Sequence, residues 1–118
     1  MGNISKHFDR EEFACPDGCG FNAVDIELLG VLEDIRKHFE KPVRINSACR
    51  CDKHNKKVGG VKDSQHKKAK ATDIVISGVS PTDVAHYLDK KYPDKYGIGL
   101  YETFTHIDAR EIKARWKR

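Results

Sequence analysis

The longest regular hydrophobic pattern in the chain predicts an amphipathic helix. Apolar side chains recur at intervals of three and four residues, which places them on one face of a helix. They are Ile26, Leu28, Leu29, Leu32, Ile35 and Phe39. Asp25 is suited to cap the first turn, because its carboxylate can accept a backbone hydrogen bond. Pro42 closes the element, since a proline disfavours helical geometry in the residue before it, Lys41.

Shorter patterns predict strands. Residues 42–47 alternate apolar and polar side chains, as a half-buried strand does. Residues 71–77 contain consecutive aliphatic side chains, which is typical of a buried strand. Residues 96–101 and 103–109 are also strand-like. The polar stretch 49–70 is predicted to be an irregular loop.

A second helix is predicted after Ser80, because Pro81 suits the first helical turn, and it ends near Pro93. The first part of the chain has only turn and short-helix signals, and the chain ends in a basic tail that holds Trp116. Helices interspersed with short strands indicate an α+β fold, with a small antiparallel sheet packed with helices. The 118 residues fit one domain, 1–118.

Charge adds one local feature to this picture. The chain carries 22 Lys and Arg against 18 Asp and Glu, a formal charge of +4. Residues 50–70 hold eight basic and two acidic side chains. Such a patch can attract any polyanion, including a bacterial wall, or it can be a solvated loop. We expect no specific nucleic-acid partner, because no stacking aromatics are interleaved with these lysines.

Two common targeting signals are not found in the sequence. No apolar stretch reaches the roughly 18 residues that a membrane span needs. The start, MGNISKHFDREEF, lacks the apolar centre of a secretory signal. We therefore expect a protein made in the cytoplasm that reaches any outside target after release, as in lysis from within, or by another export route.

Three side chains suggest a metal site. His66 and Asp73 lie seven positions apart, and His106 falls inside another predicted strand. Two imidazoles and one carboxylate are a ligand set of catalytic zinc, which keeps a fourth position for water. Zinc lowers the pKa of that water towards about 7 and polarises a carbonyl group. On spacing alone, each histidine can equally be an exposed or hydrogen-bonded side chain.

Two longer motifs resemble the M15 peptidases, which are zinc D-Ala-D-Ala carboxypeptidases and L-alanyl-D-glutamate endopeptidases that share a fold with the Hedgehog signalling domain. The motifs are Ser64-x-His66-x-x-Ala69-x-Ala71-x-Asp73 and Gly97-Ile-Gly-x-Tyr101-x-x-Phe104-x-His106-x-Asp108-x-Arg110. Shorter stretches are similar to the phage and bacterial branch of the family. These are Ser5-Lys-His-Phe8, Glu12-Phe13-x-Cys15, Ser47-x-x-Arg50 and His54-Asn55-x-x-Val58-Gly59-Gly60.

The resemblance implies a set of roles. His66, Asp73 and His106 match the zinc ligands of one catalytic ion. Arg50 matches an arginine that faces the substrate or its polarised carbonyl, a role suited to a planar, always charged donor. Ser64 and Gln65 are further candidates for substrate binding. The implied substrate is the stem peptide of peptidoglycan, and we expect a monomer that acts like a phage lysin or a cellular wall enzyme.

The sequence departs from the family pattern at two positions. Ala69 stands where the family has a glycine. If the position needs a positive φ, the alanine is strained by about 1 kcal/mol. Thr103 stands where some relatives place an acid. We expect Glu102 to replace that acid, with Asp108 as the second candidate. In a regular strand both side chains would point to the same side as His106. Asp108 can instead orient an imidazole. A wall-binding module without catalysis is the alternative function.

The four cysteines form two close pairs in the sequence. They are Cys15, Cys19, Cys49 and Cys51. Free thiols, one or two disulfides, or a structural zinc site with four thiolates are all compatible with this spacing.

Overall fold

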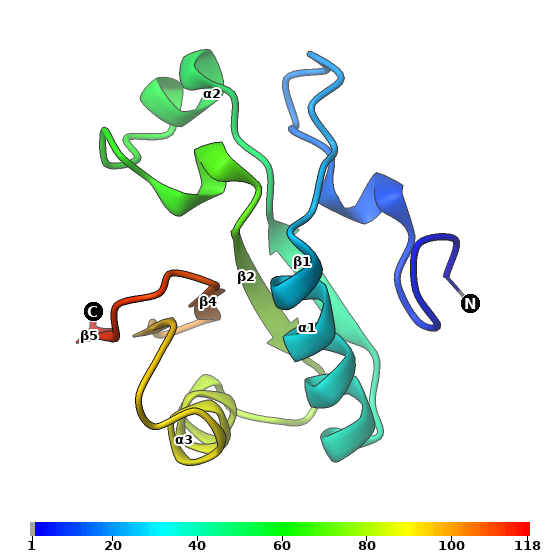
Figure 1. The fold of residues 1–118 in the computed structure, drawn as a ribbon, viewed down its shortest axis with the longest axis vertical. Coiled ribbons are helices and arrows are strands. Elements are labelled where there is room, and N and C mark those ends of the chain that lie inside the picture. The colour runs from blue at the N-terminus through cyan, green and yellow to red at the C-terminus, as the bar shows by residue number, and fades with distance from the viewer. Residues whose placement is uncertain (1) are drawn as a thin grey trace.

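The computed structural model describes residues 2–118 and is built around one five-stranded mixed sheet (Figure 1). The strand order is β1-β2-β4-β3-β5. The strands are β1 (Val43–Ser47), β2 (Ala71–Ile76), β3 (Gly97–Leu100), β4 (Thr105–Asp108) and β5 (Ala114–Lys117). The first four strands pair antiparallel with their neighbours, whereas β5 runs parallel to β3. The α+β prediction is confirmed, and the sheet is mixed where an antiparallel one was expected.

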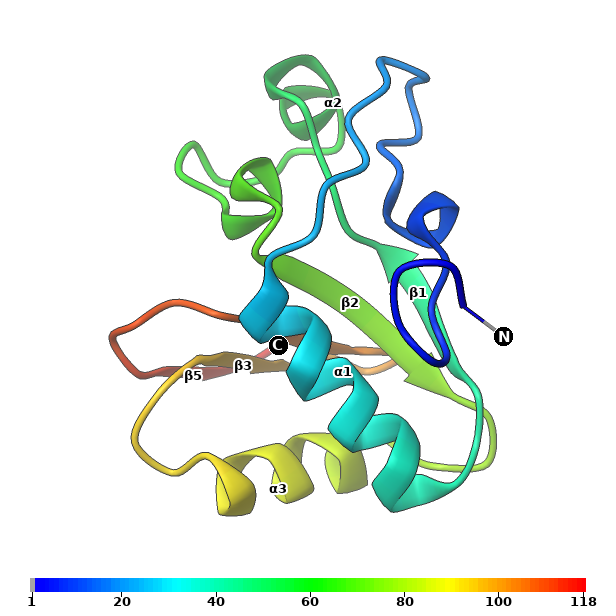
Figure 2. The ribbon, with the colours of Figure 1, turned by 45° about the vertical axis from the view of Figure 1, so that its right-hand side comes forward.

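Two helices cover one face of this sheet. Helix α1 (Ile26–Phe39) crosses in front of β2, and α3 (Pro81–Lys91) runs below β3 (Figure 2). Their apolar side chains form one core with alternate residues of the strands. The central members are Leu28, Leu32, Ile35, Ile74, Val84, Leu88, Ile98 and Ile107. Because side chains alternate along a strand, the residues between these point to the opposite face of the sheet.

Local chemistry explains where both helices begin and end. The carboxylate of Asp25 accepts a hydrogen bond from the backbone N–H of Leu28 at 3.1 Å, as predicted for an N-cap. Helix α1 ends in Glu40, which adopts a left-handed conformation with φ of 56°. Ser80 caps α3 in the same way as Asp25 caps α1, with Pro81 in the first turn.

Two short helices and the last strand were missed by the pattern analysis, whereas η1 (Arg10–Phe13) lies near the start, where short-helix signals were expected. Helix α2 (Asp52–Lys57) and the 3-10 helix η2 (Gln65–Lys68) lie in the stretch expected to be a loop. These elements are too short and polar to show a hydrophobic period. The expected basic tail is strand β5, whose pairing with β3 depends on tertiary contacts rather than on its own sequence.

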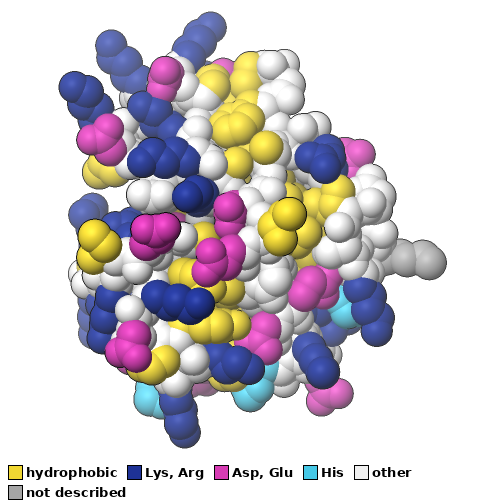
Figure 3. Space-filling model, viewed as in Figure 1, with side chains coloured by type: hydrophobic (Ala, Val, Ile, Leu, Met, Phe, Trp, Pro, Cys, Tyr) yellow, Lys and Arg dark blue, Asp and Glu magenta, His cyan; other side chains and the backbone are white. Residues whose placement is uncertain are grey.

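The basic patch lies over α2 and the loop that follows it (Figure 3). Lys53, Lys56, Lys57 and Lys62 are exposed there. Among residues 2–118, no helix has the length and apolar character needed to cross a membrane.

Candidate metal centre

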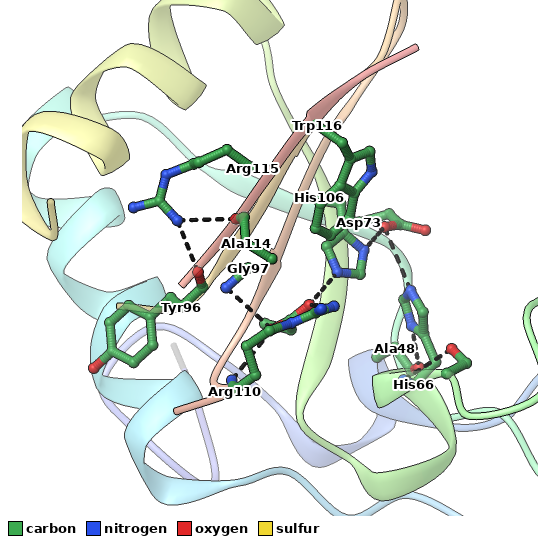
Figure 4. A network of polar contacts seen from close by, with 12 residues as sticks. Ala48, His66, Asp73, Tyr96, Gly97, His106, Arg110, Ala114, Arg115 and Trp116 are labelled. Carbon is green, nitrogen blue, oxygen red and sulfur yellow. Dashed lines mark hydrogen bonds and ion pairs between the residues drawn. The ribbon is translucent and has the colours of Figure 1, made fainter. Parts of the chain in front are cut away.

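The structure brings His66, Asp73 and His106 together on the face of the sheet opposite the two helices (Figure 4). Asp73 in β2 and His106 in β4 are directly opposite one another across the sheet. His66 reaches them from η2, the turn that precedes β2. All three side chains are buried. Residues distant in the sequence therefore share one polar cluster within the protein.

The spacing of the donor atoms suits a small divalent metal ion. The Nδ1 atom of His106 lies 2.9 Å from Oδ1 of Asp73, and Nε2 of His66 lies 3.5 Å from the same oxygen. Tetrahedral ligands with bonds of about 2.0–2.1 Å lie about 3.3 Å from one another. The observed distances lie on either side of that value, so small side-chain movements would complete the site.

The second nitrogen of each imidazole fixes which nitrogen is free for a metal. Nδ1 of His66 lies 2.7 Å from the carbonyl oxygen of Ala48, which can only accept a hydrogen bond. Nε2 of His106 lies 2.7 Å from Oδ2 of Asp108. With a proton on each of these nitrogens, Nε2 of His66 and Nδ1 of His106 present lone pairs toward Asp73. This support of both rings is the arrangement that metal-binding histidines use, and the three residues fit a metal on this ground.

Asp108 is the centre of a second layer of contacts. It is fully buried and accepts two hydrogen bonds from the guanidinium of Arg110, both of 2.7 Å, and one from the backbone N–H of Gly97. Burial would raise the pKa of Asp108, but the hydrogen bonds from His106 and Arg110 hold that pKa well below its usual range. Asp108 is therefore a carboxylate that orients His106.

Asp73 is also kept ionised. Burial opposes the charge, yet in the metal-free protein the imidazoles of His106 and His66, when protonated on the nitrogens that face Asp73, lower the pKa of Asp73 far below that of an ordinary aspartate. A carboxylate must be deprotonated to bind a metal, so this environment favours the ligand form of Asp73.

Two glycines of β3 leave room for these groups. Gly97 is paired with Asp108, and a Cβ atom at Gly97 would collide with the Asp108 carboxylate. Gly99 lies between His106 on one side and Trp116 on the other, and a Cβ atom there would collide with the indole of Trp116. The Gly-Ile-Gly sequence of β3 thus allows large polar and aromatic side chains to cross this face of the sheet.

The three candidate metal ligands line a cavity of about 420 Å³. Its walls include all three ligand candidates together with residues from the loops on either side. Among the wall residues are Arg50, Ser64, Gln65, Tyr101, Arg110 and Trp116. The indole N–H of Trp116 donates a 2.9 Å hydrogen bond to the Tyr101 hydroxyl, so these two aromatic residues form one side of the cavity together.

The sequence-predicted residues Arg50, Ser64 and Gln65 all line this cavity. The guanidinium of Arg50 approaches Oδ2 of Asp73 at 3.5 Å and Oδ1 of Asn55 at 3.3 Å. Ser64 is buried and caps η2, because its hydroxyl accepts the backbone N–H of His66 at 3.2 Å. Ser64 therefore positions the histidine, whereas Arg50 and Gln65 face the open space.

Neither of the two acids expected to move protons, Glu102 and Asp108, lines the cavity. Glu102 is exposed in the bend before β4 and is not among the residues that line the cavity. Strand β4 begins at Thr105, so the regular alternation of side chains that would place Glu102 on the same side as His106 does not reach Glu102. Among residues 2–118, Asp63 is the only acidic side chain besides Asp73 that lines the cavity. Sequence reasoning missed Asp63, because no local pattern shows that its loop folds over the metal centre.

Ala69 does adopt a positive φ, which is the case in which strain was expected. Ala69 follows η2 with φ of 59° and ψ of 25°, which is the left-handed conformation that favours glycine. Its backbone N–H donates to the carbonyl of His66 at 3.4 Å and its carbonyl accepts from Asp25. The strained alanine therefore closes the turn that carries the first histidine.

The cysteines separate into a cluster and one isolated residue. Cys15, Cys19 and Cys51 lie together with Asp17, whereas Cys49 is buried with its thiol 2.9 Å from the carbonyl of Ala23. Burial raises the pKa of Cys49 to about 11. Of the four cysteines, Cys49 is thus the one outside the cluster around Asp17.

Comparison with known proteins agrees with the motifs. A family model described as peptidase M15 matches residues 6–108, which include every candidate ligand of the metal centre. No curated protein matches the chain.

Proposed function

Since the chain belongs to the peptidase M15 family, we propose that it is a zinc peptidase that cleaves the stem peptides of bacterial peptidoglycan. Family membership indicates a metallopeptidase. The observation that supports zinc is the convergence of two imidazole lone pairs and one ionised carboxylate at the floor of a cavity. A terminal D-Ala-D-Ala bond and an internal L-Ala-D-Glu bond are the two candidate cleavage sites.

The metal has a defined chemical contribution. When bound, zinc would lower the pKa of a coordinated water towards about 7 and polarise the scissile carbonyl. His66, Asp73 and His106 would hold it. Asp108 and the Ala48 carbonyl keep the two imidazoles in the tautomers that this requires.

Arg50 is placed to bind the reacting part of the substrate. Its guanidinium lies at the cavity wall beside Asp73, and it also donates to Ser47 at 3.3 Å. These contacts hold a planar cation in one orientation with part of its surface facing the open space. In that place Arg50 would donate to a carbonyl oxygen as negative charge develops on it, or to a substrate carboxylate.

Proton transfer requires a group that is free to exchange protons. Asp108 is fully buried and its oxygens are engaged by Arg110, Gly97 and His106, so it is not free. Asp63 has an exposed carboxylate at the cavity wall. We assign proton transfer to Asp63 on this ground.

The experiment is cleavage of purified peptidoglycan by the zinc-loaded protein. New amino groups and shortened stem peptides, detected by mass spectrometry, are expected with the parent protein and absent with His66→Ala. Release of free D-alanine would identify the carboxypeptidase, and a new N-terminal D-glutamate would identify the endopeptidase. Intact stem peptides after incubation with fully zinc-loaded parent would overturn the proposal.

The alternative is a wall-binding module that keeps zinc without catalysis. It is favoured by one observation: position 103 is a threonine, and Glu102 is not among the residues that line the cavity. Such a module would sediment with insoluble peptidoglycan and leave every stem peptide intact.

A further inference from the structure

A second group of metal-binding side chains lies outside the cavity, at the junction of two loops. Cys15, Asp17 and Cys19 come from the turn that follows η1, and Cys51 precedes α2. Each offers one donor atom, and the four atoms all lie within 4.8 Å of one another. None of these residues lines the cavity of the metal centre.

The turn is shaped so that alternate side chains converge. Gly18 and Gly20 adopt positive φ values of 75° and 90°, which bend the backbone sharply. The backbone N–H of Cys15 donates to the carbonyl of Phe21 at 2.7 Å and closes the loop. Cys15, Asp17 and Cys19 therefore all project toward Cys51.

The distances match a tetrahedral metal site. Sγ of Cys15 lies 3.8 Å from Sγ of Cys51. Two thiolates bound to zinc at about 2.3 Å lie about 3.8 Å apart in a tetrahedron. The carboxylate of Asp17 approaches both sulfurs, at 3.3 Å to Cys15 and 2.9 Å to Cys51. The carboxylate of Asp17 and the three sulfurs thus lie close enough together to share one ion.

Backbone donors support the sulfurs from outside. The N–H of Cys51 points to Sγ of Cys15 at 3.5 Å, and the N–H of His54 points to Sγ of Cys51 at 3.4 Å. These two N–H groups help to hold the sulfurs of Cys15 and Cys51 in place. The N–H of Cys19 donates to Asp17 at 3.0 Å and holds the carboxylate in the cluster.

We propose that Cys15, Cys19, Cys51 and Asp17 bind a second, structural zinc ion. Three soft thiolates favour zinc over the hard cations magnesium and calcium. With Asp17 as the fourth ligand the coordination sphere is closed, as in structural rather than catalytic sites.

The site would link the N-terminal turn to the substrate-binding wall. Cys51 follows Arg50 directly, and the backbone N–H of Arg50 donates to the carbonyl of His66 at 3.1 Å. An ion at the cysteines would therefore fix one end of the segment that carries Arg50 and contacts the first histidine of the metal centre.

The experiment counts zinc and identifies its ligands separately. We expect about two equivalents of zinc per parent chain, and about one in Cys51→Ser, in Cys19→Ser and in His66→Ala. Cys49→Ser is the matched control and keeps both ions. After exchange into cobalt, a thiolate-to-cobalt charge-transfer band is expected in the parent, in Cys49→Ser and in His66→Ala, because the metal centre itself contains no sulfur.

Two results would overturn the second site. One is a zinc content and cobalt spectrum that Cys51→Ser and Cys19→Ser leave unchanged. The other is an intact mass of the zinc-treated parent that lacks two hydrogens, which would mean a disulfide among these cysteines. Cys19 is exposed, so Cys19→Ser tests the site even if Cys51→Ser does not fold. Zinc loss in His66→Ala tests the metal centre independently.

Discussion

Asp108 accepts a hydrogen bond from Nε2 of His106 at 2.7 Å, while its own position is fixed by Arg110 from the other side. The pair is two residues apart in β4, so both side chains project from the same face of the sheet. A buried carboxylate thereby directs Nδ1 of the imidazole toward Asp73.

We predict that Asp108→Asn weakens zinc binding at the metal centre by about 10–100-fold. The amide is a poorer acceptor for His106 and presents an N–H group to Arg110 or to the imidazole. Competition titration against a zinc-binding dye measures the change. Asp89→Asn is the control, because Asp89 is also paired with an arginine, at 2.6 Å from Arg115, but lies exposed on α3. Equal zinc affinity in the two variants would contradict the role of Asp108.

A second prediction concerns Gly99 and the single tryptophan. In Gly99→Ala the new methyl group would collide with the indole of Trp116. We expect a loss of about 1–3 kcal/mol in the free energy of unfolding and a shift in tryptophan emission. Gly30→Ala is the control, since Gly30 is exposed in α1 with open space around it. That variant should gain about 0.5–1 kcal/mol from improved helix propensity. Urea unfolding followed by circular dichroism distinguishes the opposite signs.

The sequence predicts the parts of this fold that have strong local signals. Helix α1 has both a clear apolar face and a capping aspartate, and α3 has a serine followed by proline, so both were located from their own residues. Strand β5 lacks such a signal, because its partner strand β3 and Tyr101, which Trp116 contacts, lie elsewhere in the chain. Its parallel pairing is a property of the assembled sheet.

The candidate site shows the same division. Family resemblance identified His66, Asp73 and His106 as a set, and the structure brings them together. Asp63 and Asp17 belong to no recognised sequence motif. Asp63 reaches the cavity and Asp17 reaches Cys51 only because loops fold against distant segments, and the spacing of residues along the chain does not predict such contacts.

A third prediction uses the left-handed conformation of Ala69. Ala69→Gly removes a Cβ strain of about 1–2 kcal/mol, and the greater freedom of glycine in the unfolded chain offsets part of this gain. We expect a net stabilisation of about 0.5 kcal/mol in thermal or urea unfolding. Ala14→Gly is the control, because Ala14 is exposed with φ of −65° and should only lose stability. Destabilisation by Ala69→Gly would show that its turn does not carry this strain.

A fourth prediction concerns pH and the N-terminal segment. Burial disfavours the charge of Glu33, but hydrogen bonds from Ser5 at 2.6 Å and from the His7 backbone at 2.8 Å, with the His7 ring also close, lower the pKa of Glu33 below its ordinary value of 4.5. A carboxylate whose folded pKa is depressed adds stability above its unfolded pKa and loses it as the pH falls through the folded pKa.

Unfolding of the parent should therefore become easier on acidification below about pH 4.5, and Glu33→Gln should reduce that slope. Glu111→Gln, an exposed residue outside this contact, serves as the control. Urea unfolding measured at a series of pH values provides the comparison. A slope that Glu33→Gln leaves intact would assign the acid sensitivity to other carboxylates.

The last prediction separates the two carboxylates that compete for proton transfer. Asp63 lines the cavity, whereas Glu102 lies in an exposed bend outside it. Because general acid–base catalysis contributes about 10²–10⁴-fold, Asp63→Asn should lower kcat by a factor in that range and leave zinc content unchanged. Glu102→Gln removes an equally exposed charge and should retain nearly full activity. The measurement is the initial rate of stem-peptide cleavage by protein of verified zinc content. If Glu102→Gln loses activity while Asp63→Asn does not, the bend before β4 must close over the cavity during catalysis, and the sequence-based preference for Glu102 would be restored.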